Sequence, residues 1–79
     1  MKIEDIVTVD PETLGGTPVF KGTRVPVQSL FWHLEKGITI EDFIDDFPSV
    51  TYEQVMQLLE LTGNLFETSK FQKVYEAVA

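Results

Sequence analysis

Cysteine is absent from this sequence of 79 residues, and histidine occurs once, as His33. Without cysteine the chain can form no disulfide, no thiolate metal site and no cysteine nucleophile. A metal site needs about three or four ligands, which would here have to come almost entirely from carboxylates. The sequence also has no nucleophile–base pattern and no glycine-rich phosphate loop. These shortages predict a protein without metal, cofactor or enzymatic activity, in which His33 is structural or exposed.

Long apolar runs are absent as well. No stretch approaches the roughly 20 apolar residues of a membrane-spanning helix. The pattern of a signal peptide, a basic start followed by an apolar run, is not visible either. The lack of cysteine is typical of proteins from a reducing compartment. We therefore expect a cytoplasmic protein that does not engage a membrane.

Basic residues are scarce: 6 Lys and Arg stand against 13 Asp and Glu, for a net charge of −7. Phosphate contacts dominate nucleic-acid affinity, so this balance disfavours nonspecific DNA binding. It leaves open a local basic patch on an acidic body, or a basic protein partner. The length predicts a single domain over residues 1–79, and a core this small favours a partner or a second copy.

Residues 1–25 are predicted to form an N-terminal arm. Residues 6–9 favour a strand, and residues 10–12 read as one helical turn with an acidic cap and a proline. The string GGTPVFKGTRVPV, residues 15–27, combines permissive glycines with rigid prolines. It predicts a tight hairpin or loop with Gly22 in a left-handed conformation, which projects Lys21 and Arg24 from a stiff backbone.

Residues 26–62 are predicted to form a core of three helices. The first begins with Pro26 at its first position, and Gly37 ends it. Its apolar face has helical spacing and consists of Val27, Leu30, Phe31 and Leu34. The second helix, residues 40–47, is capped by Thr39. The third starts at Thr51, whose capping box with Gln54 is a second, independent start signal.

Residues 63–79 are predicted to form a C-terminal helical extension. One apolar face at helical spacing comprises Phe71, Val74, Tyr75 and Val78. This helix either folds back on the core or docks on a partner or a second copy, and the short chain favours docking.

Three short helices with tight connections are typical of a helix-turn-helix unit. The sequence resembles the domain-of-unknown-function family 433 over roughly residues 6 to 62. The resemblance is carried by Val9-Asp10-Pro11, Gly15-Gly16-x-Pro18, Lys21-Gly22-Thr23-Arg24-Val25-Pro26-Val27, Gly37, Phe47-Pro48 and Thr51-x-x-Gln54-Val55. It implies a mostly helical fold of the homeodomain-like, three-helix DNA-binding class. The expected structure is therefore a helix-turn-helix domain with a short strand or hairpin arm and a C-terminal extension.

The resemblance also implies a function. Members of the family look like antitoxins, often encoded beside a PIN-type ribonuclease toxin that they bind and silence, with autoregulation of transcription through the helix-turn-helix. The third helix, residues 51 to about 61, would then be the recognition helix. The implied DNA-binding residues are Lys21, Arg24, Thr51, Tyr52, Gln54 and Gln57. Alternatives are a DNA-binding regulator without a toxin role, and an interaction module that binds no nucleic acid.

The candidate residues for contact with a protein partner are Trp32, Asp45, Asp46, Phe71 and Tyr75. Trp32 lies off the apolar stripe of the first helix, so it either completes the core or anchors an interface. The acidic run on the second helix is either a solvated face or a docking face for a basic nuclease. Arg24 contacts nucleic acid or a partner, or else pairs with Asp10 or Glu12 and holds the arm. A homodimer is expected, through paired half-sites or through strand pairing of residues 6–9.

Overall fold

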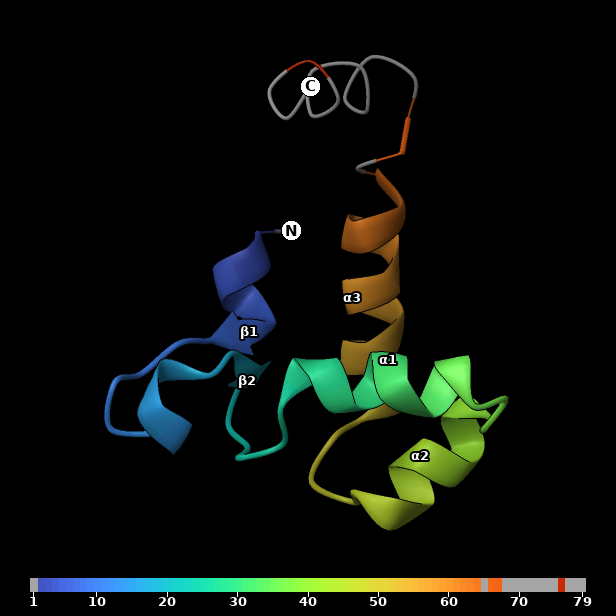
Figure 1. Cartoon of the computed structure of the whole chain (residues 1–79), viewed down its shortest axis with the longest axis horizontal. Coiled ribbons are helices and arrows are strands. Elements are labelled where there is room, and N and C mark those ends of the chain that lie inside the picture. The colour runs from blue at the N-terminus through green and yellow to red at the C-terminus, as the bar shows by residue number, and fades with distance from the viewer. Residues whose placement is uncertain (1, 65, 68–75, 77–79) are drawn as a thin grey trace.

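Three helices follow a small antiparallel hairpin in the computed structural model, which describes residues 2–64, 66, 67 and 76. The helices are α1 (Val27–Glu35), α2 (Ile40–Asp46) and α3 (Tyr52–Asn64). In Figure 1, α2 lies along one side of α1, and α3 extends away on the other side. The expectation of a mostly helical small domain with an N-terminal hairpin is confirmed at this level.

Local hydrogen bonds define the helix boundaries. At the start of α2 the hydroxyl of Thr39 accepts from the backbone N–H of Asp42 at 3.1 Å, as predicted. After α1 the chain turns at Gly37, whose φ of +79° suits glycine. The N–H of Gly37 donates to Leu34, and that of Ile38 to His33, both at 3.0 Å. These two bonds form a Schellman motif, so α1 ends where the glycine predicted.

Two predicted details before α1 differ from the structure. Pro26 is not the first helical residue, because its backbone is extended, with φ −61° and ψ 136°, and it forms a bridge with Val19. Over residues 10–12 the structure has a single hydrogen-bonded turn with the predicted acidic cap, and not a turn of helix. The Asp10 carboxylate accepts from the N–H of Glu12 at 2.9 Å, and its carbonyl accepts from Thr13 at 2.9 Å. This aspartate turn replaces the helix, because the side chain satisfies the N–H two residues on.

The N-terminal arm is built from very short elements. Its strands, β1 (Val7–Thr8) and β2 (Val19–Phe20), pair antiparallel with Val7 opposite Phe20. Two 3₁₀ turns, Ile3–Asp5 and Leu14–Gly16, lie before β1 and between the strands. On its other side β2 contacts the residues that lead into α1, since the N–H of Phe20 donates to the carbonyl of Val25 at 3.0 Å. The strand predicted over residues 6–9 is therefore present but shorter.

One apolar core joins the arm to the helices. Phe20 and Phe43 are both fully buried, and their ring centroids lie 6.3 Å apart. The other buried members of this core are Ile6, Val25, Leu30, Val50, Val55 and Leu58. The core thus draws on β2, all three helices and the connection before α3, and it fixes the arm against the helices.

The predicted C-terminal extension, residues 63–79, lies largely outside the described residues. By sequence alone, Gly63 and Asn64 could either end the third helix or be tolerated inside it, and they belong to α3, which runs past the expected recognition-helix residues 51 to about 61. Phe71 and Tyr75 are not described. Within the part of the chain that is described, no helix has the length and apolar character needed to cross a membrane.

Candidate partner and nucleic-acid interfaces

A stiff turn displays two cations of the arm, Lys21 and Arg24. The N–H of Thr23 donates to the carbonyl of Phe20 at 3.0 Å, and Gly22 has φ +79°, the left-handed conformation predicted for it. The hydroxyl of Thr23 also donates to Phe20 at 2.8 Å. Lys21 and Arg24 are both exposed. Because the turn is closed by both backbone and side-chain bonds, these cations leave a backbone of fixed shape.

Arg24 is unpaired among the described residues. The predicted alternative, in which it holds the arm by pairing with Asp10 or Glu12, is not formed in this part of the chain. An exposed guanidinium in this state keeps its planar set of donors available for a carboxylate or a phosphate.

Gln54 connects this turn to the start of α3. Its amide nitrogen donates to the carbonyl of Lys21 at 2.9 Å, across 33 positions of sequence. Its amide oxygen accepts from the N–H of Thr51 at 3.0 Å, and the hydroxyl of Thr51 accepts from the N–H of Gln54 at 3.1 Å. The predicted capping box is confirmed, and the same side chain also fastens the arm. Three of the residues predicted to bind nucleic acid, Lys21, Thr51 and Gln54, thus lie close together. The side chain of Gln54, however, makes structural hydrogen bonds.

The outward side of α3 offers an aromatic, a thioether and carboxylates. Tyr52 is 54% exposed and Met56 is 41% exposed. The amide of Gln57 donates to the carboxylate of Glu53 at 3.3 Å, one turn earlier. The helix has no Lys or Arg. Sequence reasoning missed Met56, although its position four residues after Tyr52 places the two on one face.

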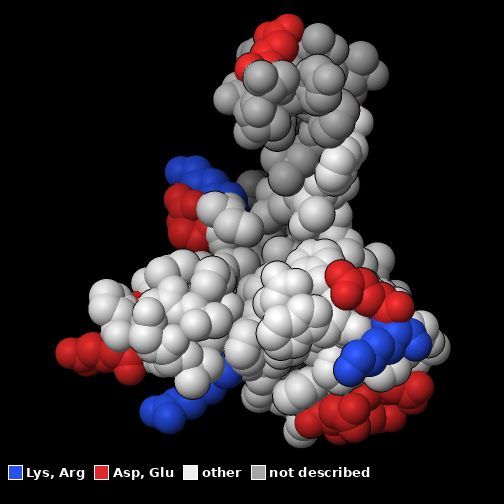
Figure 2. All heavy atoms as spheres, viewed as in Figure 1, with Lys and Arg blue, Asp and Glu red and all other residues white. Residues whose placement is uncertain are grey.

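The outer face of α2 is acidic. Its four carboxylates are all exposed: Glu41, Asp42, Asp45 and Asp46. Figure 2 shows acidic side chains gathered over this helix. Glu41 and Asp42 lie in the first turn, where the helix dipole stabilises anions. Asp45 and Asp46 lie in the last turn, which has no basic residue and where the dipole disfavours anions.

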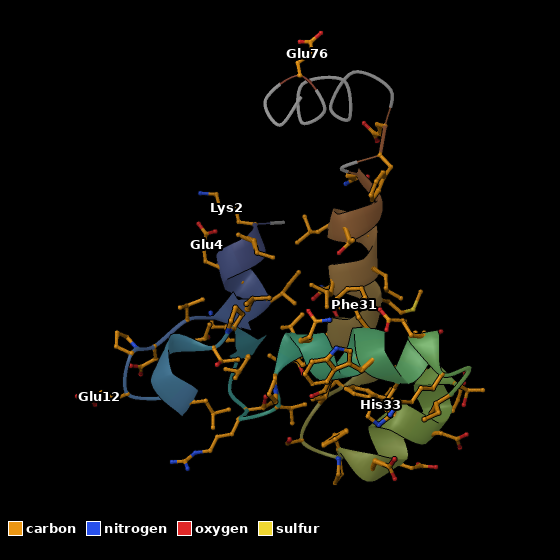
Figure 3. All side chains as sticks on the ribbon, viewed as in Figure 1. Lys2, Glu4, Glu12, Phe31, His33 and Glu76 are labelled. Carbon is orange, nitrogen blue, oxygen red and sulfur yellow. The ribbon has the colours of Figure 1, made fainter. Side chains whose placement is uncertain are left out.

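Adjacent residues of α1 have opposite roles. Trp32 is 54% exposed, so it does not complete the core. The Nδ1 atom of His33 lies 2.6 Å from the carbonyl of Ser29, and its ring meets Phe43 and Phe47 edge-on at 5.1 and 5.6 Å. Figure 3 shows His33 between α1 and α2. Its ring is thus a packing element between two helices, and Trp32 is the one available for contact.

No metal centre is formed by the described residues, since no three acidic or histidine side chains there gather closely enough to hold an ion.

Comparison with known proteins gives a family and a relative. The family described as "Protein of unknown function (DUF433)" matches residues 7–61. The "Uncharacterized protein y4eO" of Sinorhizobium fredii is 41% identical over 51 residues, which are 65% of this chain and 23% of the relative. The chain therefore spans less than a quarter of the length of that curated relative. No solved structure is significantly similar to the chain.

Proposed function

The chain belongs to the family of proteins of unknown function DUF433, and from this premise we propose that it is the antitoxin of a toxin–antitoxin pair. It binds and neutralises a PIN-type ribonuclease and has no catalytic activity of its own. The proposal combines the family resemblance carried by residues 15–27, here called the signature string, with the surface chemistry of α2. The proposal places the protein in the cytoplasm, because the nuclease would act on transcripts there.

The acidic face of α2 is the observation that carries this proposal. A ribonuclease must attract RNA phosphates, so the surface around its site is expected to be basic. Asp45 and Asp46 occupy the end of α2 that the helix dipole makes unfavourable for anions. These two carboxylates do not stabilise the helix at that end, but they give α2 a negative surface that complements a basic partner.

The test is inhibition of the nuclease encoded beside this gene, measured as RNA cleavage during titration with the full chain. Stoichiometric inhibition is expected, together with co-elution of the two proteins. The double variant Asp45→Asn with Asp46→Asn should weaken inhibition about 10-fold at low salt, in the range of close interfacial charge pairs. The matched control, Glu4→Gln with Glu12→Gln, removes two exposed carboxylates from the arm and should change inhibition less than about 3-fold. Absence of inhibition by the unmodified chain would refute the antitoxin role.

Operator binding is the second candidate function. Under this proposal the three helices form a homeodomain-like helix-turn-helix, in which α3 lies near the major groove and the turn with Lys21 and Arg24 contacts phosphate. The favouring observation is that Arg24 is exposed and unpaired within the described residues, on a turn held at the start of α3. A homodimer would present two such units to paired half-sites.

A salt titration tests this second function. Duplex DNA from upstream of the gene should bind with an affinity that falls steeply with salt, and Arg24→Ala should abolish most of that binding. The control is Lys36→Ala, which removes an exposed cation at the end of α1. Equal loss in both variants, or no binding at low salt, would reject operator recognition through the arm.

A further inference from the structure

An apolar strip runs along the outward side of α3. Tyr52, Met56, Leu59 and Gly63 are spaced by four, three and four residues, which places them on one face of a helix. Leu59 is half-buried against the core, whereas Tyr52 and Met56 are 54% and 41% exposed. We call these four residues the α3 strip. It lies beside the core-facing residues Val55 and Leu58, so α3 is apolar well beyond the face that packs inside the domain.

Carboxylates border the α3 strip on its solvent side. Glu53 and Glu60 are exposed and, seven residues apart, lie on the same ridge of the helix. No Lys or Arg occurs in α3 to balance them. The surface is therefore an apolar line with an acidic rim, and its complement is an apolar groove with a basic rim.

We infer that the α3 strip is a docking surface for a basic protein partner, which buries Tyr52 and Met56 in an apolar groove. Tyrosine and methionine are enriched at the centres of protein interfaces, because they bring large apolar area with adaptable shape. This inference rests on the proposed function, with the nuclease as the partner, and adds the part of the surface that supplies apolar contact.

Two other occupants fit the α3 strip less well. Nucleic acid is disfavoured because Glu53 and Glu60 would face phosphates, and because the α3 strip itself carries no Arg, Lys, Asn or Gln to read base edges. A second copy is disfavoured because pairing two α3 strips would bring two acidic rims together in a chain of net charge −7.

Gly63 gives the strip a place for close approach. A Cβ atom added there would meet none of the described residues within 4 Å, and its backbone is helical. We therefore expect the described part of the domain to accept a side chain at this exposed position. In the docked state it would meet the partner, so Gly63→Leu separates an effect on binding from an effect on folding.

The experiment measures the affinity of the full chain for the purified nuclease encoded beside its gene. Met56→Arg should weaken binding about 30-fold, as expected for loss of a central interface contact, and Gly63→Leu about 10-fold. The control Val9→Arg makes the same charge change at an apolar side chain that is 62% exposed on the arm, and should weaken binding less than about 3-fold. Thermal midpoints of Met56→Arg and Val9→Arg should stay near that of the unmodified chain, because both sites are exposed. That of Gly63→Leu should rise slightly, since leucine favours the helix more than glycine does.

The outcomes separate this inference from the proposed function. If the unmodified chain binds but Met56→Arg binds as well as it does, the α3 strip is not the interface, and the antitoxin role stands. If Met56→Arg and Val9→Arg weaken binding equally, only net charge matters, which also overturns the inference. If Tyr52→Ala impairs binding of upstream duplex DNA but not of the nuclease, α3 contacts nucleic acid and the inference is wrong. If the unmodified chain does not bind the nuclease, both proposals fall.

Discussion

The arm and the helices reach the same degree of burial by different means. The arm, residues 2–26, has two strands of two residues each, yet it contributes four fully or nearly fully buried side chains: Ile6, Val19, Phe20 and Val25. The helices bury Leu30, Phe43, Val55 and Leu58 through regular spacing and caps. The arm instead depends on turns, bridges and contacts across the chain. The comparison teaches that the signature string is part of the core, although its elements are too short to stand alone.

Two contacts make the arm and the helices one structure. The ring of Phe20 meets that of Phe43, and the amide of Gln54 donates to the carbonyl of Lys21. If the two regions unfold as one unit, damage on the arm side must be felt in the helices. Three substitutions test this, in order of expected effect.

The largest effect is expected for Phe20→Ala. Truncating a fully buried phenylalanine removes its transfer free energy and leaves a cavity, at a cost of about 3–5 kcal/mol in the free energy of unfolding. Urea unfolding followed by the helical circular dichroism signal measures this cost. The expected result is a loss similar to that of Phe43→Ala. Helices that keep their midpoint while the arm is lost would show that the two regions are independent.

A smaller effect is expected for Gln54→Glu. Glutamate can still accept from the N–H of Thr51, but it cannot donate to the carbonyl of Lys21, so the cap remains and the link to the arm is lost. We expect a loss of about 1–2 kcal/mol in the free energy of unfolding, and faster hydrogen exchange at the N–H of Thr23. Gln57→Glu makes the same charge change on the next turn and should cost less than about 0.5 kcal/mol. Equal costs would mean that charge, and not the link, is responsible.

The smallest effects should have opposite signs in the two regions. Gly22→Ala forces alanine to φ +79° and should lower the free energy of unfolding by about 1 kcal/mol. At Gly63, within α3, an added Cβ meets none of the described residues within 4 Å, so Gly63→Ala should raise it by about 0.5–1 kcal/mol, because alanine favours the helix. Thermal unfolding of both variants measures the difference. Two changes of the same sign would contradict the distinction between a turn that needs glycine and a helix that does not.

The same contrast explains what the sequence could predict. The caps at Thr39 and Thr51 and the stop at Gly37 involve residues within one turn of each other, and all three were predicted. The place of Pro26 was missed because it depends on pairing with Val19. The sequence left open whether Gly63 ends the third helix or is tolerated inside it, and it lies inside, because one glycine costs a helix only about 1 kcal/mol.

The candidate sites follow the same division. The exposed carboxylates of α2 and the exposed cations of the turn could be predicted, because each belongs to one local element. The link from Gln54 to Lys21 spans 33 positions and has no local signal. The exposure of Met56 depends on which side of α3 packs against the core. The helix has neighbouring apolar stripes, and sequence spacing alone does not tell which of them is buried.

The short connection between α1 and α2 has a consequence for the speed of folding. Lys36, Gly37 and Ile38 have their N–H groups bonded to the last turn of α1, and Thr39 caps the start of α2. A loop this short, with its conformation already set, closes at little entropic cost. We expect this helical hairpin to form first, within the microseconds typical of local contacts. The pairing of β1 with β2 and the Gln54 link, which join distant positions, then complete the domain and set its overall folding rate.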